Sequence, residues 1–265
     1  MKLQPLSHQE YLKKEKLKKF ATLALQIGVL VVFIIVWEVL AQTGVIDSFI
    51  TSSPSKIVNT VVNLTKSGGL WRHVWVSTYE TVVGFAIGTA LGYLIATLLW
   101  WNDLMRRVFE PYLVVLNSLP KIALGPLIIL WVGTGKASII VMTILISVVI
   151  TTITILNGFC ETDVNKILLL ESMHAKKRQV FFKLVAPANV PTLLATLKIN
   201  VGMSWVGSIM GEYLVSKEGL GYLLIYGAQT FKLDLVMTCT IVLCALAGIM
   251  YACVSTLEKL VAKKY

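Results

Sequence analysis

Six long apolar runs constrain the fold of this 265-residue chain more than any other feature. Each run reaches the roughly 20 residues that an α-helix needs to cross about 30 Å of hydrocarbon. The runs are Phe20–Ala41, Thr81–Trp101, Tyr112–Gly133, Ala137–Leu156, Leu193–Tyr213 and Leu235–Leu257. With 56% hydrophobic and only 14% charged residues, the sequence predicts an all-α, polytopic membrane protein with six transmembrane helices.

The positions of the cations predict the orientation. If the N-terminus is inside, 16 Lys and Arg residues fall on inner segments and 6 on outer loops. This excess follows the positive-inside rule, so both termini are predicted to be cytoplasmic. The sequence then divides into a basic cytoplasmic N-terminus (1–19), a transmembrane domain (20–257) and a cytoplasmic tail (258–265). The net charge of +10 is explained without a nucleic-acid partner.

Motifs for chemistry within the chain are weak. The apolar part of the first run is too long for a cleavable signal peptide, so it is expected to stay as a span. The segment Gly133–Ser138 (GTGKAS) departs from the phosphate-loop pattern at Leu130 and Ala137. His8, His73 and His174 lie in different segments, and the four Cys have no metal-ligand spacing. We therefore expect no catalytic residue, no metal site and no nucleotide site.

The inner loop at 158–192 is too long and too basic for a simple turn. Val164–Met173 and Lys176–Val185 both predict helices, separated at His174, and Pro187 with Pro191 is expected to end the second. One apolar ridge is predicted for the second helix, with its cations left free for water, lipid phosphate or a partner. The ridge residues are Val180, Phe181, Leu184 and Val185, and the cations are Lys176, Lys177, Arg178 and Lys183. The alternative is an amphipathic helix on the membrane surface without a partner.

The third apolar run is expected to break near its middle, because Pro120 and Pro126 interrupt it. Broken helices at membrane depth expose backbone groups that face protein or a water-filled cavity. Asn117, Ser118 and Lys121 are therefore candidates to line a pathway. Lys121 could serve an anionic solute, or a partner carboxylate could neutralise it. Elsewhere Lys198 and Glu212 are interpreted as interface anchors, and Glu38 as the one deep carboxylate.

Small residues predict close helix packing. Gly84, Gly88 and Gly92 recur every fourth residue, and Gly207 and Gly211 do the same. This small-xxx-small pattern lets two backbones approach each other, and contacts within the chain are favoured over a dimer contact. In the first outer loop, apolar residues between Ile57 and Leu64 predict a short helix on the membrane surface or against the bundle.

The inner loop resembles the coupling segment of permease subunits of ABC importers. That pattern reads Glu-Ala-Ala, three residues, Gly, nine residues, then a hydrophobic residue, any residue and Leu-Pro. Ala186-Pro187 stands in the Leu-Pro place, while Leu168 replaces the motif Glu and His174 the motif Gly. His tolerates the positive φ that Gly supplies at such a turn better than most residues do. Segments 117–136 and 205–224 resemble the nitrate, sulfonate, taurine and bicarbonate group, and the likeness extends over about 37–257.

The resemblance implies a type I importer permease in the bacterial inner membrane, surrounded by lipid. It implies a second permease copy, a cytoplasmic ABC ATPase dimer that binds ATP and Mg²⁺, and an extracytoplasmic solute-binding protein. The residues implied to couple to the ATPase are Glu171, His174, Ala175, Val180, Phe181, Leu184 and Pro187, with Phe181 seated in an ATPase groove. The implied solute is a small anion such as a sulfonate, nitrate or bicarbonate, or alternatively a pyrimidine or flavin precursor.

Two other classes of protein remain open from the residues alone. A secondary transporter or channel commonly shows inverted repeats or a membrane carboxylate for ion coupling, and the two halves of this chain do not match each other. A membrane scaffold for a soluble enzyme would need the inner loop but no solute pathway.

Overall fold

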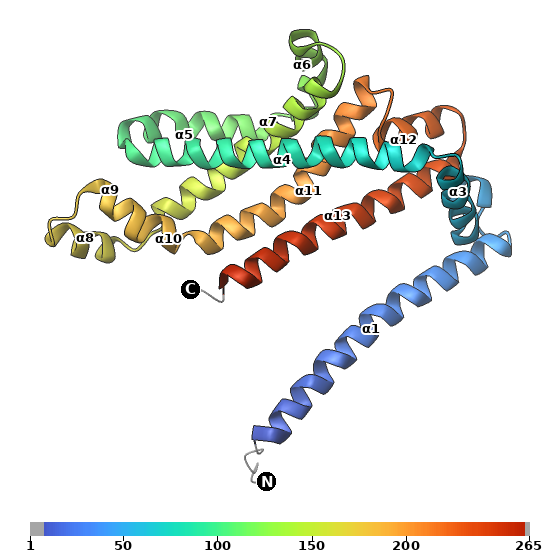
Figure 1. The fold of residues 1–265 in the computed structure, drawn as a ribbon, viewed down its shortest axis with the longest axis horizontal. Coiled ribbons are helices and arrows are strands. Elements are labelled where there is room, and N and C mark those ends of the chain that lie inside the picture. Colours follow the sequence, from blue (N-terminus) through green and yellow to red (C-terminus); the bar gives the residue numbers. More distant parts are fainter. Residues whose placement is uncertain (1–7, 263–265) are drawn as a thin grey trace.

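The computed structural model describes residues 8–262, and every regular element among them is helical (Figure 1). Positions 1–7 of the predicted N-terminus and 263–265 of the predicted tail lie outside the described residues. Five of the described helices are long and apolar enough to cross a membrane. They are α1 (His8–Gln42), α4 (Gly69–Trp101), α7 (Lys136–Cys160), α11 (Val190–Val215) and α13 (Leu233–Ala262). The all-α membrane fold is confirmed.

The predicted count of six spanning helices is not confirmed, because the run Tyr112–Gly133 is not one helix. It is divided between α5 (Asp103–Ser118), the 3-10 turn η1 (Lys121–Leu124) and α6 (Gly125–Val132). Leu119 is extended, with φ −64° and ψ 137°, because a residue before proline avoids the helical region. The predicted break at Pro120 is thus confirmed, and it is the reason that this run yields two short helices.

Apart from α5, η1 and α6, the shorter elements lie at the two ends of the bundle (Figure 1). One end carries α2 (Ser48–Thr51), α3 (Pro54–Lys66) and α12 (Leu220–Gln229). The other end carries α8 (Val164–Ser172), α9 (Lys177–Val180), the π-helical turn η2 (Phe181–Val185) and α10 (Ala186–Ala188). The predicted inner loop and the predicted outer loops therefore lie at opposite ends. Which end faces the cytoplasm stays a prediction from the distribution of cations.

Helix α3 fulfils the prediction for the first outer loop. Ser53 caps it, accepting a hydrogen bond from the Lys56 backbone N–H at 3.3 Å, and Pro54 occupies a first-turn position where no N–H is needed. Ile57 is buried, and Val61 and Leu64 pack on the apolar cluster formed with α12 and α13. The helix therefore lies against the bundle rather than free on the membrane surface.

The core is the contact of α4 with α7 and α11, and the predicted glycines make it possible. A methyl group added at Gly84, Gly88 or Gly92 would lie 2.5–2.6 Å from the Cβ of Thr143, Ser147 or Thr151 respectively. At each of these three glycines, the missing side chain of α4 leaves space for one side chain of α7. Gly207 and Gly211 of α11 approach the α7 backbone in the same way. The predicted packing within the chain is confirmed.

Buried hydroxyl and amide groups cross-link the same three helices. Hydrogen bonds join Thr81 to Ser208 (2.6 Å), Ser147 to Ser204 (2.9 Å) and Asn200 to Thr151 (2.5 Å). Each pair joins two different helices, and each hydroxyl or amide is fully buried. Because an unpaired polar group in hydrocarbon is costly, these bonds favour one register of the helices.

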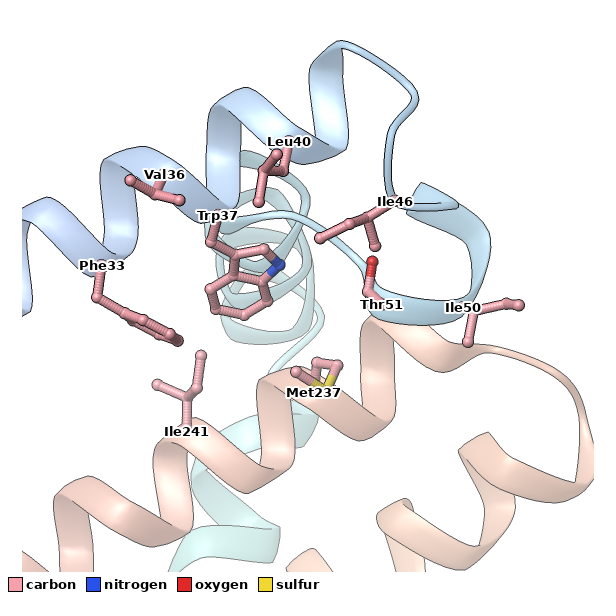
Figure 2. Close-up of a pocket in the computed structure, with 9 residues that line it drawn as sticks. All are labelled: Phe33, Val36, Trp37, Leu40, Ile46, Ile50, Thr51, Met237 and Ile241. Carbon is pink, nitrogen blue, oxygen red and sulfur yellow. The ribbon is translucent and has the colours of Figure 1, made fainter.

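Helix α1 diverges from the bundle and contacts it near its C-terminal end, through α2 and α3 (Figure 1). There the Glu38 carboxylate accepts hydrogen bonds from the Ser55 backbone N–H at 3.0 Å and from the Gln42 amide at 2.7 Å. Figure 2 shows an apolar cleft between α1 and α13 with Trp37 and Met237 facing each other across it. Its volume is about 560 Å³. Its lining suits hydrocarbon, so this cleft is not a pathway for a polar solute.

Candidate functional site

The inner hairpin formed by α8 and α9 has well-defined caps. The Asp163 carboxylate accepts the Asn165 N–H at 2.9 Å at the start of α8. At its end the Ala175 N–H donates to the Leu170 carbonyl (3.0 Å) and the His174 N–H to the Glu171 carbonyl (2.9 Å). These two bonds form a Schellman motif, with His174 at φ 61° in the position that usually holds glycine. The predicted helix-turn-helix and its positive-φ turn are confirmed.

The predicted apolar ridge faces the body of the protein. Val180, Phe181 and Val185 are buried in a cluster with residues of α4 and α7. The Phe181 ring lies 5.1 Å from Trp100, 5.4 Å from Trp101 and 5.4 Å from Phe159, measured between centroids. The expectation that Phe181 enters an ATPase groove is therefore wrong for this structure, since its own chain encloses the ring.

The buried residues Phe181 and Val185 begin and end a π-helical turn. The Ala186 N–H donates to the Phe181 carbonyl, five residues earlier, and Pro187 has no N–H to continue the α-helical pattern. Phe181 and Val185, four residues apart, lie on the same inward side. Pro187 and Pro191 do not end the segment as predicted, because each occupies the first turn of a following helix, α10 or α11.

The remaining predicted coupling residues lie nearer the surface. Glu171 and His174 are exposed, whereas Ala175, Leu184 and Pro187 are partly buried. The four cations of the second helix are exposed, as predicted. Lys177 places its ammonium 5.4 Å from the centroid of the Trp100 ring, and the Arg178 guanidinium lies 5.8 Å from that of Phe182. These aromatic contacts orient two of the cations at the free edge of the hairpin.

Five large apolar side chains of the hairpin are exposed, and the sequence analysis missed them as a group. They are Val164, Leu168, Leu169, Met173 and Phe182, with exposed fractions of 55–71%. The spacing of four residues from Val164 to Leu168 and from Leu169 to Met173, the C-cap of α8, is the signal that could have found them. Exposed apolar groups next to the four exposed cations of the second helix are typical of a protein-binding surface.

The broken third run brings the predicted pathway residues together. The Lys121 ammonium donates to the Asn117 side-chain oxygen at 3.2 Å, and the Ser118 hydroxyl donates to the Val114 carbonyl at 2.7 Å. Asn117 and Ser118 are exposed. Within residues 8–262, the side-chain partner of Lys121 is this neutral amide and not a carboxylate. The ammonium charge is therefore not neutralised within the described chain.

A second polar feature lies at the end that carries α3 and α12. A pocket of about 690 Å³ is lined by Arg72, Lys136 and Lys217, and also by Glu218, which pairs with Arg72. Two of its three cations therefore lack a carboxylate partner among the described residues. The pocket is cationic overall, and the sequence analysis did not predict it because its residues come from three separate segments.

The two residues interpreted as interface anchors behave differently. Lys198 is partly exposed and forms an ion pair with Glu258 of α13. Glu212, in contrast, is only 1% exposed, and its neighbour Glu80 of α4 is fully buried. The interpretation of Glu212 as an anchor is wrong, and Glu38 is not the deepest carboxylate. Glu80 was missed because α4 begins at Gly69, twelve residues before the predicted span.

Comparison with known proteins gives a consistent family. The model of the family described as binding-protein-dependent transport system inner membrane component matches residues 88–265. A formylaminopyrimidine transport permease protein of Halalkalibacterium halodurans is 31% identical over 71% of this chain and 74% of its own length. A putative aliphatic sulfonates transport permease protein of Bacillus subtilis is 28% identical over 88% and 84%. A probable ABC transporter permease protein of Haemophilus influenzae is 29% identical over 83% and 89%.

A solved structure supports the fold. The inward-facing MetNI methionine ABC transporter contains a chain that superposes with a TM-score of 0.64 at 20% identity. The match covers 74% of this chain and 98% of that chain.

Proposed function

This chain belongs to the family of binding-protein-dependent transport system inner membrane components, and we propose that it carries a small anionic solute inward. The family consists of transport components, so the chain is a permease subunit of a type I ABC importer rather than an enzyme. It is a multi-pass protein of the inner membrane. The proposed partners are a second permease copy, a solute-binding protein on the outer side and a cytoplasmic ATPase dimer that binds ATP and Mg²⁺.

The observation that carries the coupling proposal is the asymmetry of the inner hairpin. Its inward side packs on α4 and α7 through Phe181, so a force on the hairpin reaches the ends of two spanning helices directly. Its free side presents apolar groups and cations, the combination that suits a soluble partner. In this proposal ATP-driven movement of the ATPases displaces the hairpin together with α4 and α7.

Met173→Asp tests this docking. Met173 is 71% exposed, so an aspartate there leaves the core of the hairpin intact but places a desolvated charge in the proposed interface. Central interface residues contribute about 2 kcal/mol or more, so recovery of the ATPase in a pull-down is expected to fall roughly tenfold or more. Val45→Asp is the matched control, since Val45 is 73% exposed at the opposite end of the molecule. Equal recovery with both variants would contradict the docking proposal.

The proposal of an anionic solute is supported by the two cationic features. Lys121 lies in the broken segment without a carboxylate partner among the described residues, and the cationic pocket lies at the predicted outer end. The sulfonate permease relative favours the same class of solute. The relative that transports formylaminopyrimidine favours a pyrimidine precursor, which is the second candidate.

Lys121→Ala distinguishes these solutes. A charge-assisted hydrogen bond contributes about 1.5–3 kcal/mol, so uptake of an alkanesulfonate into cells or proteoliposomes is expected to fall roughly tenfold or more. Lys66→Ala, which removes an exposed cation from the end of α3, should leave uptake unchanged. Unchanged sulfonate uptake in Lys121→Ala would remove the argument for an anion. Uptake of a formylaminopyrimidine by the wild type, without uptake of a sulfonate, would establish the second candidate.

A further inference from the structure

The carboxyl groups of Glu80 and Glu212 form a buried pair that the proposed transport function does not use. Glu80 belongs to α4 and Glu212 to α11, and the two residues are 0% and 1% exposed. They lie beneath the loop that joins α11 to α12, residues 216–219, which we call the clamp loop. Two acidic groups enclosed together need an explanation, because burying a charge without a counter-charge is expensive.

The two carboxyl groups differ in their hydrogen-bond donors. Glu212 Oε2 accepts the Gly221 backbone N–H at 2.5 Å, and the Ser77 hydroxyl is a further partner. When both groups are ionised, neither oxygen of Glu80 has a donor among the described residues, although the Glu212 carboxyl lies within hydrogen-bonding reach. A proton on either group would turn the contact between two acceptors into a donor and an acceptor.

We propose that Glu80 and Glu212 share one proton and that this acid pair fastens the clamp loop to α4. Two carboxyl groups in contact away from water do not both ionise, since like charges repel strongly where the dielectric constant is low. With one proton the pair carries a single negative charge. The Gly221 N–H and the Ser77 hydroxyl then stabilise this charge.

The clamp loop and the start of α12 meet α4 at three further points, each one helical turn or less from the next. Glu218 pairs with Arg72, the Gly219 N–H donates to His73 Nδ1 at 2.9 Å, and the Leu220 N–H donates to Ser77 Oγ at 2.7 Å. Ser77 therefore accepts a hydrogen bond from the start of α12 and also interacts with the Glu212 carboxyl. In this proposal a change in charge on the acid pair reaches the loop through the Ser77 hydroxyl.

Tight packing favours a proton over a metal cation at this point. A methyl group added at Gly219, where φ is 108°, would lie 2.3 Å from Glu212 Oε2. One added at Gly221 would lie 2.8 Å from Glu212 Cβ. The carboxyl group is thus enclosed by backbone on the side of the loop. A proton needs no volume of its own, whereas a cation needs several oxygen ligands around it.

Other ionisable groups near the pair lie on α7, the clamp loop and α13, and Tyr213 of α11 also interacts with Glu212. Lys136 of α7 attracts the charge of Glu80, and Glu218 of the clamp loop repels it. Cys239 of α13 interacts electrostatically with Glu212. Of Lys136, Glu218 and Cys239, Lys136 alone is a cation. It can offset the single negative charge that the acid pair carries with one proton, but not the two charges of a fully ionised pair.

Infrared spectroscopy of the purified full-length protein tests the proposal. With ¹³C-labelled glutamate, the wild type at pH 7 should show the C=O absorption of one protonated glutamate per chain, lost at alkaline pH. Glu80→Gln should fold, because the amide can donate to Glu212 as the protonated acid does, and should lack this absorption. Glu38→Gln is the matched control, since Glu38 is partly exposed and already has two donors. It should retain the absorption.

Three results would overturn the proposal. The first is the absence of a protonated glutamate in the wild type at pH 7, which decides the question even if Glu80→Gln fails to fold. The second is an absorption that persists in folded Glu80→Gln. The third is thermal stability at pH 7 that requires Na⁺ in the wild type without a protonated glutamate, which would indicate a cation site. None of these measurements depends on the solute or on the partner proteins.

Discussion

Phe181→Ala is expected to destabilise the inner hairpin by about 3–5 kcal/mol, the usual cost of removing a buried aromatic ring. The Phe181 ring is 2% exposed and contacts Trp100, Trp101 and Phe159, so its loss leaves a cavity at the junction of the hairpin with α4 and α7. The equilibrium for local opening of the hairpin should rise on the order of 100-fold or more. Trypsin reports this opening, because Lys176, Lys177 and Arg178 lie in the same segment.

Phe182→Ala is the matched control for this experiment. The two phenylalanines are adjacent and their rings are in contact, yet the Phe182 side chain is 59% exposed. Its removal should change the rate of cleavage by less than about threefold, since exposed positions seldom contribute more than about 0.5 kcal/mol. In a pull-down of the ATPase, Phe182→Ala would then report the interface, whereas Phe181→Ala would report a loosened hairpin. Equal rates of cleavage in the two variants would show that Phe181 does not anchor the hairpin.

The comparison of Phe181 with Phe182 shows how far the sequence could predict the site. The spacing of Val180, Phe181, Leu184 and Val185 correctly indicated one apolar side of a helix. Spacing does not indicate what that side contacts. The partners of Phe181 are about 80 and 20 residues away in the chain, at the ends of α4 and α7, and the π-helical turn changes the period from 3.6 residues.

The acid pair was missed for a different physical reason. A hydropathy scan assumes that a spanning helix faces lipid, so it rejects the polar first turns of α4 that contain Arg72, His73 and Glu80. In the structure Arg72 and His73 are paired with the clamp loop, and Glu80 is buried beside Glu212 of α11. Polar residues are tolerated in such a helix where they face protein. The break at Pro120 could be predicted because proline changes the backbone locally, without reference to distant residues.

Gly88→Leu is expected to prevent the helices of the core from assembling. An added Cβ at Gly88 would lie 2.6 Å from the Cβ of Ser147 and 3.2 Å from the Ile144 carbonyl oxygen. Neither of these two atoms is the end of a flexible side chain, so α4 and α7 must move apart. The contacts of Gly84 with Thr143 and of Gly92 with Thr151 on the same face are then lost. Even the smaller change Gly88→Ala should cost about 1–3 kcal/mol, and leucine more. Because the whole folding free energy is about 5–15 kcal/mol, leucine should remove much of the folded protein.

Gly202→Ala separates this effect from the general effect of replacing a glycine in a membrane helix. Gly202 lies on α11, one of the three packed helices, but an added Cβ there meets nothing within 4 Å. Alanine should therefore leave the thermal unfolding midpoint unchanged, or raise stability by up to about 1 kcal/mol because alanine is the better helix former. Gel filtration of detergent-extracted protein should show a single folded peak for Gly202→Ala, a less stable one for Gly88→Ala and aggregate for Gly88→Leu. A folded Gly88→Leu protein with an unchanged midpoint would mean that α4 and α7 are not held together by the interlocking of Gly88 with Ser147.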